Sequence, residues 1–224
     1  SGMSELNSIV IGDRSVRGVS SSSDSLFTIS NCSNLKSIRI GAGSVVNYKR
    51  FVLNRLNKLE SLSFGLNSLS SVERMELSSI SLKQLTFGSN ELGNTRELVL
   101  RELNGLERVV IGDRSFRMGE SERNDGLLRI QNCSQLKSIE CNDGSFEDYE
   151  SIELNGLASL QSLVFGSNCF KFSSSLSLNG LNELRTIRFG SSSFAETESF
   201  SIGNSSLTLL NELSFGEGSL IGVH

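Results

Sequence analysis

The chain contains no proline and no tryptophan, and its one histidine is the last residue, His224. A histidine general base, a Ser-His-Asp triad and a His-ligated zinc site are therefore strongly disfavoured. No stretch approaches the roughly 18 apolar residues of a membrane-spanning helix, so we expect no membrane insertion. The 21 basic residues do not outnumber the 25 acidic ones, and the net charge is −4. This balance disfavours nucleic acid as a partner.

An internal repeat runs through the whole length of the chain. The segment Leu59–Gly65 returns as Leu160–Gly166 and again as Leu184–Gly190. Related segments start at Leu6, Leu35, Leu82, Leu106, Leu136 and Leu210. Successive starts lie between 23 residues (Leu59 to Leu82) and 30 residues (Leu106 to Leu136) apart. This spacing predicts a solenoid with eight complete turns and a ninth partial turn.

Each turn contains two short alternations of apolar and polar residues, such as Leu62 with Phe64 and Leu98 with Leu100. A period of two indicates a strand with one buried face, and no segment shows a sustained helical period. One turn cannot bury its own apolar face, so turns must stack about 4.8 Å apart as parallel ladders. We therefore predict a mainly β, right-handed parallel solenoid with two short strands per turn, one sheet on each side and little or no helix.

A glycine follows the first strand in almost every turn. These glycines are Gly12, Gly41, Gly65, Gly88, Gly112, Gly166, Gly190 and Gly216. Asn142 takes this place in the remaining turn, and asparagine is the residue that best shares the positive φ of glycine. We therefore predict a left-handed backbone at this corner. Apolar residues that follow it, such as Phe116 and Phe146, are predicted to point back into the core.

A longer period overlies the short one. Ile11–Arg17 returns as Ile111–Arg117, and Ile29–Ile38 returns as Ile130–Ile139. Offsets of 100 and 101 residues indicate duplication of a four-turn block. The longest turn of each block carries a polar loop, and a rigid scaffold commonly presents binding residues on such loops. The candidate loop residues are Arg17, Asp24, Arg117, Glu120 and Arg123.

The strand signature L-x-x-L-x-[FI] resembles the leucine-rich repeat. The variant Asn-Cys-Ser-x-Leu-Lys-Ser-Ile, with Gly-x-x-Ser-Phe in the same turn, is similar to the BspA-like class of bacterial and protozoal surface proteins. This resemblance covers nearly the whole chain and implies a binding scaffold without catalysis. The asparagine ladder usual in the family is kept only at Asn67, Asn90 and Asn168. This departure, together with the regular second strand, predicts a straighter rod with two sheets.

The outward positions of the first strand form the candidate binding face. Its residues are Lys36, Arg39, Glu60, Lys83, Arg108, Lys137, Glu140, Arg185 and Arg188. The sign of the charge alternates through Lys36, Glu60, Lys83, Glu107 and Lys137, which predicts opposite charges side by side in adjacent turns. Two interpretations stay open. The pairs only stabilise the sheet and protect it from aggregation, or they form a mixed-charge face for a partner.

The four cysteines are predicted to be buried, unpaired thiols. Cys32 and Cys133 lie in a column that holds Leu or Ile in other turns, and four turns separate them, too far for a disulfide. No C-x-x-C motif is present, so we predict neither a metal site nor a cofactor. Unpaired thiols favour a reducing compartment, whereas the family resemblance implies a cell surface.

Ser1 and Gly2 precede Met3 as residues of an expression vector would, so we take 4–224 as a single domain. Neither end shows a polar capping unit, which is typical of a piece of a longer array or of end-to-end self-association.

The leading hypothesis is a non-catalytic scaffold that binds a protein partner through the first-strand face and the long loops. The alternative is a cell-surface adhesin or carbohydrate-binding solenoid. A minor alternative is a polysaccharide-active enzyme, because Asp113 and Asp143 occupy equivalent places in adjacent turns near Glu140. Two carboxylates at that spacing are able to hold a hard cation.

Overall fold

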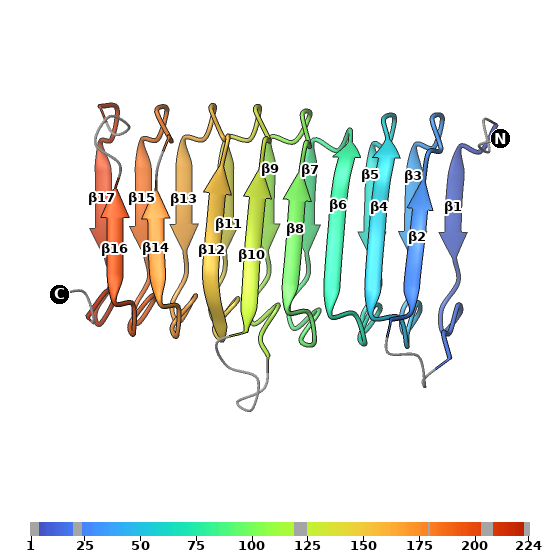
Figure 1. Ribbon diagram of the computed structural model, residues 1–224, viewed down its shortest axis with the longest axis horizontal. Coiled ribbons are helices and arrows are strands. Elements are labelled where there is room, and N and C mark those ends of the chain that lie inside the picture. Colours follow the sequence, from blue (N-terminus) through green and yellow to red (C-terminus); the bar gives the residue numbers. More distant parts are fainter. Residues whose placement is uncertain (1–4, 20–23, 119–124, 179, 203–207, 222–224) are drawn as a thin grey trace.

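The computed structural model describes residues 5–19, 24–118, 125–178, 180–202 and 208–221. These residues contain no helix and form a parallel β-solenoid of about seven turns. The strands lie in two layers along a rod, with β1 at one end and β17 at the other (Figure 1). The prediction of a mainly β solenoid with stacked parallel strands is confirmed.

The odd-numbered strands form one layer, and each has four residues. They are β1 (Ser8–Ile11), β3 (Ser37–Ile40), β5 (Ser61–Phe64), β7 (Gln84–Phe87), β9 (Arg108–Ile111), β11 (Ser138–Cys141), β13 (Ser162–Phe165), β15 (Thr186–Phe189) and β17 (Glu212–Phe215). Their second and fourth residues face the core because side chains alternate along a strand.

The even-numbered strands form the opposite layer. They are β2 (Leu26–Ser30), β4 (Arg50–Leu56), β6 (Arg74–Ile80), β8 (Glu97–Arg101), β10 (Gly126–Gln131), β12 (Tyr149–Asn155), β14 (Ser175–Leu178) and β16 (Ser199–Ile202). All eight pair in parallel in one continuous sheet, in sequence order from β2 to β16.

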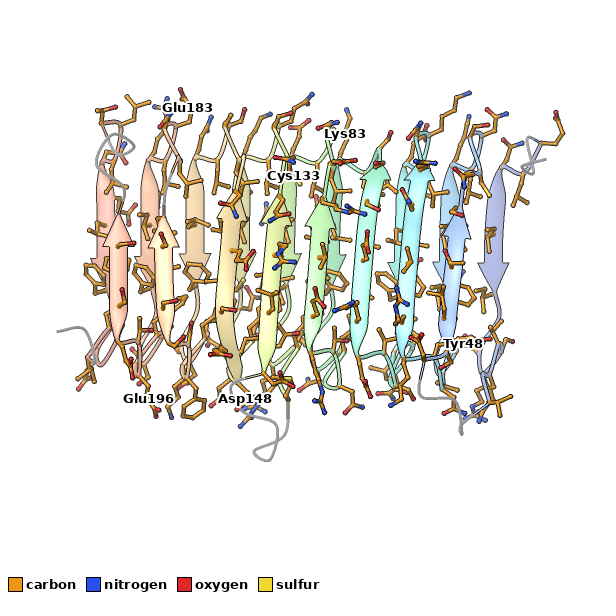
Figure 2. The ribbon with its side chains drawn as sticks, in the orientation of Figure 1. Tyr48, Lys83, Cys133, Asp148, Glu183 and Glu196 are labelled. Atoms are coloured by element: carbon orange, nitrogen blue, oxygen red, sulfur yellow. The ribbon has the colours of Figure 1, made fainter. Side chains whose placement is uncertain are left out.

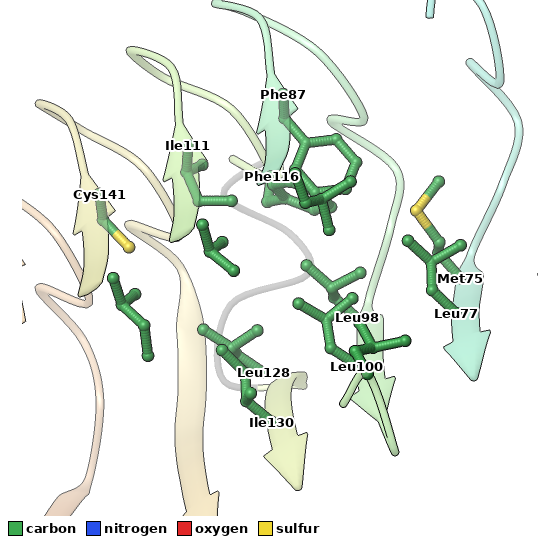
Figure 3. Close-up of a cluster of buried hydrophobic side chains, with 14 of the residues drawn as sticks. Met75, Leu77, Phe87, Leu98, Leu100, Ile111, Phe116, Leu128, Ile130 and Cys141 are labelled. Atoms are coloured by element: carbon green, nitrogen blue, oxygen red, sulfur yellow. The ribbon is translucent and has the colours of Figure 1, made fainter. Parts of the chain in front are cut away.

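Columns of identical residue types fill the space between the layers. Leu98 and Leu100 of β8 lie beside Leu128 of β10, under aromatic rings from the odd layer (Figure 3). The ring of Phe116 stacks on that of Phe146 with centroids 4.7 Å apart, and Phe116 is fully buried. Stacking each turn on the next therefore buries the apolar faces that no single turn can cover.

The predicted left-handed backbone at the glycine column is wrong. Among the described residues, positive φ falls two and four residues later, as at Gly43 (φ 61°) and Val45 (φ 55°). The glycine itself is required by close approach, since a Cβ on Gly65 would lie 2.4 Å from the amide nitrogen of Ala42 in the preceding turn. The column that holds Asn67 and Asn90 is the column of left-handed residues, which explains why Asn or Gly occupies most of its positions.

The prediction of one sheet on each side is wrong for the odd layer. The odd strands form two sheets, β1-β3-β5 and β7 to β17, and no ladder joins β5 to β7 (Figure 1). The N–H of Gly88, which follows β7, donates to Oε2 of Glu91 at 3.0 Å rather than to the preceding turn. Glu91 stands three residues after the glycine, where the other turns have Ser or Cys169. The carboxylate therefore competes with the ladder at this one junction.

Candidate binding surfaces

The nine residues of the candidate binding face lie on the outer side of the odd strands or at the corners where these strands begin, and the structure divides them into two groups. Those from β9 onward make ion pairs, mostly with residues of neighbouring turns. Nη2 of Arg108 lies 2.7 Å from Oε2 of Glu140, and Nζ of Lys137 lies 2.7 Å from Oε2 of Glu107. Arg188 similarly pairs with Glu212 at 2.5 Å. Arg185 makes a longer contact, 3.8 Å, with Glu183 on the same turn.

These pairs change the pKa of their members. The hydrogen bond from Lys137 lowers the pKa of Glu107, and the hydrogen bond from Arg188 lowers that of Glu212. All of these groups are exposed to solvent, where salt screens ion pairs and their contribution to stability is small. The pairs consequently set the charge pattern of this face rather than its stability.

The second group lies on the first four turns and has a different environment. Within the described part of the chain, no ion pair or hydrogen bond engages the side chains of Lys36, Arg39, Glu60 or Lys83. The predicted charge pairing is therefore confirmed between Glu107 and Lys137 but not between Lys36 and Glu60. Lys83 lies at the corner where β7 begins, across the sheet break from Glu60 (Figure 2).

The candidate loop residues are only partly described. Nε of Arg117 lies 2.8 Å from Oε2 of Glu147, and Asp24 lies 3.6 Å from Nη1 of Arg50. Arg17 is exposed, and its backbone bridges to Val46 in the next turn. Glu120 and Arg123 lie outside the described residues. The described loop ends are thus held against the rod.

The outer face of the even layer carries a charged concavity that the sequence analysis missed. It has a volume of about 610 Å³. Its lining includes Arg50, Arg74, Arg96, Glu97, Asp125 and Arg129. A signal was present in the sequence, because Arg50 and Arg74 hold the same outward position in successive turns.

The acids and bases of this concavity pair with each other. Nη1 of Arg96 lies 2.9 Å from Asp125, Nε of Arg129 lies 2.7 Å from Glu153, and Arg74 pairs with Glu97. The hydrogen bond with Glu153 raises the pKa of Arg129, and the same bond lowers the pKa of Glu153. The concavity is largely neutralised from within and offers few free charges to a ligand.

All four cysteines are free and buried, as predicted. Burial raises the pKa of Cys133 to about 11 and that of Cys169 to about 12. A thiol with such a pKa stays protonated at neutral pH and reacts slowly. Cys32 and Cys133 fill the core in the way that Leu does in other turns, whereas Cys169 takes the place of the corner serine, with its Sγ 3.1 Å from the carbonyl of Asn142.

Two of the three carboxylates of the minor enzyme hypothesis, those of Asp143 and Glu140, are engaged with the protein. Oδ1 of Asp143 accepts a hydrogen bond from the N–H of Ser167 at 2.7 Å, as Asp13 does from Ala42 at 2.8 Å. Glu140 pairs with Arg108. In the described ranges, no three His, Cys, Asp or Glu side chains gather where they could hold a metal ion.

Comparisons with protein-family models, with curated proteins and with solved structures found no match. The described residues also include no helix long and apolar enough to span a membrane. The function is therefore inferred from the surfaces of the molecule itself.

Proposed function

We propose that the protein is a non-catalytic scaffold that binds a protein partner through the outer face of β3, β5 and β7. We also propose that the rod has nine right-handed turns of a leucine-rich repeat similar to the BspA-like class. The nine repeat starts support the number of turns. The strong preference of parallel β connections for right-handed crossovers supports the hand.

The observation that carries the proposal is the set of cations without partners on this face. Lys36, Arg39 and Lys83 are exposed and make no direct ion pair within the described chain, although the charge of Lys83 contributes to lowering the pKa of Glu107. Arg108, Lys137 and Arg188 on the same layer are each neutralised by an acid. Glu60 lies among these cations and also makes no ion pair in the described chain, so the face keeps an excess of positive charge. Such a face favours an acidic partner, because complementary charge gives orientation and speeds association.

The test replaces Lys36, Arg39 and Lys83 together by Glu. The control replaces Arg14, Arg55 and Lys58 by Glu, which changes net charge equally at exposed positions outside β3, β5 and β7. Tagged wild type and both variants are used to capture proteins from an extract of the source organism, followed by mass spectrometry. We expect a protein retained by the wild type and the control and lost from the face variant. Equal retention by all three contradicts the proposal.

A carbohydrate-binding surface is the second candidate, and one observation favours it. Hydroxyl groups align along the even layer, where Ser151, Ser175 and Ser199 pair in register. Oγ of Ser201 lies 3.1 Å from Oγ of Ser177. Binding of the wild type to a glycan array, together with loss on replacing Ser175 and Ser199 by Lys, would support this candidate over the protein scaffold.

A further inference from the structure

The junction between β5 and β7 leaves backbone hydrogen-bonding groups without a partner strand. At the next junction, the N–H groups of Glu107 and Arg108 donate to the carbonyl of Lys83, at 2.8 and 3.3 Å. Gly112 donates to Phe87 in the same ladder, at 3.0 Å. The described residues form no equivalent bonds between β5 and β7, so the carbonyls of Glu60 and Phe64 face this junction unpaired.

The side chain of Glu91 keeps the junction between β5 and β7 unpaired. In the turns around it, a serine hydroxyl at the same position donates to the preceding turn, as Ser145 does to the carbonyl of Gly112 at 2.7 Å. A carboxylate has no proton to donate, and that of Glu91 accepts from Gly88 instead. A Cβ on Gly88 would meet the Glu91 carboxylate first, at 2.8 Å. A Cβ on Gly112 would meet the backbone of the preceding turn at 2.5 Å.

The floor of the junction is apolar and partly open to solvent. Leu62 and Phe64 of β5 are half-buried, whereas Leu85 and Phe87 of β7 are each only 1% exposed. The rings of Phe64 and Phe87 still stack with centroids 5.7 Å apart, so the core continues beneath the break. Leu66, just beyond β5, is 64% exposed. Unpaired strand edges and exposed apolar side chains therefore coincide at this junction inside the odd layer, as they do at the terminal strands β1 and β17, where Val10 and Phe215 are exposed.

We propose that the break between β5 and β7 is a slot that accepts one extended strand of a partner protein. The proposal rests on the scaffold function and adds the conformation of the bound partner. Both walls of the slot are strand edges, so the occupant must offer hydrogen-bonding groups on both of its sides. A single extended segment does so, whereas the edge strand of a folded sheet has only one free side.

The geometry defines what the partner strand contains. A strand between β5 and β7 needs two ladder spacings, about 9.6 Å, so the two strands move apart on binding. The even layer stays continuous through β4 and β6 and serves as the hinge. Inward residues of the partner lie level with Leu62 and Phe64 and are apolar. Outward residues lie between Ser63 and Thr86 and are uncharged. The repeat of this chain has that same alternation.

The test uses a fluorescein-labelled peptide with the sequence of residues 159–167, which contains a complete odd strand. A control peptide carries Leu163→Asp and Phe165→Asp. Binding to the full chain is measured by fluorescence anisotropy for wild type, Glu91→Ser and the variant with Lys36, Arg39 and Lys83 replaced by Glu. We expect saturable binding of the first peptide only, and binding about tenfold weaker or more to Glu91→Ser, in which the ladder closes.

Hydrogen exchange gives a measurement that needs no variant. The amides of Lys83 and Gln84 should exchange faster than those of Glu107 and Arg108, and slow down when the peptide binds. Equal protection of the two sets overturns the slot, as does the absence of saturable binding. Equal binding to Glu91→Ser also overturns it, because the peptide then uses an edge common to both proteins. If the variant with Lys36, Arg39 and Lys83 replaced by Glu still binds the peptide, the slot and the cationic face are separate binding sites.

Discussion

Two successive junctions of the odd layer, β5 to β7 and β7 to β9, differ in structure although they share one repeat. The second is a complete parallel ladder and the first is not paired. The clearest chemical difference lies at one position, where the first junction has Glu91 and the second has Ser115. Ser115 donates its hydroxyl proton to the carbonyl of Gly88 in the preceding turn. In a solenoid, each interface between turns is a separate contribution to stability, so one side chain alters one interface alone.

The largest effect is expected when the Glu found at the β5–β7 junction is placed at the equivalent position of the intact β7–β9 junction. Ser115→Glu buries a carboxylate at a site that is now fully buried. The free energy of unfolding should fall by about 3 to 5 kcal/mol, as for other uncompensated buried charges. Urea denaturation measures this loss, and hydrogen exchange should show the amide of Gly112 losing protection. Ser115→Ala is the control, with a loss nearer 1 to 2 kcal/mol for the missing hydrogen bond. Similar losses in the two variants would contradict the role given to the carboxylate.

A smaller effect is expected when Leu62 and Leu85, which hold equivalent core positions on the two sides of the break, are each replaced by Ala. Leu85→Ala should lower the free energy of unfolding by about 2 to 5 kcal/mol, because Leu85 is 1% exposed and leaves a cavity. Leu62→Ala should cost about half as much, because its side chain is already partly in water. Urea denaturation of both variants checks the difference. Equal losses would mean that the break is closed in solution.

The smallest effect concerns pH. Burial raises the pKa of Glu91 from its usual 4.5, and the hydrogen bond from Gly88 opposes this only in part. The folded protein therefore binds the proton more tightly than the unfolded chain, so this group adds stability as pH falls through the raised pKa. The contribution disappears as pH rises above that pKa. Relative to Glu91→Gln, wild type should lose under about 1 kcal/mol between pH 4 and pH 7. Thermal unfolding of both proteins across this range measures the difference. If the stability of the two proteins changes in parallel, the raised pKa of Glu91 is contradicted.

Several features of the fold were predictable from local pattern. The alternation of Leu62 with Phe64 and of Leu98 with Leu100 predicted the strands, and the structure places strands there. The columns that hold Cys32 and Cys133 predicted buried thiols. These predictions succeed because a side chain in a stacked turn meets the same side chain of its neighbours, so one turn describes the environment of all.

The predictions failed where a feature depends on contacts between neighbouring turns. The glycine column was expected to need positive φ, but what it needs is room for the backbone of the preceding turn. The sequence position of Glu91 does not show that its carboxylate meets the amide of Gly88. The pairs of Arg74 with Glu97 and Arg129 with Glu153 also join different turns. Such contacts depend on the register between strands.

The sequence by itself determined the period, the two strands of each turn and the residues that face the core. It did so because solvent exclusion acts on every turn alike and leaves a repeated apolar pattern. Only the tertiary structure decided that the odd layer divides between β5 and β7, and that, among the described residues, Lys36, Arg39 and Lys83 make no direct ion pair while Arg108, Lys137 and Arg188 each pair with an acid. These properties depend on distances of a few ångströms between turns, and side chains of different turns become neighbours only when the rod is assembled.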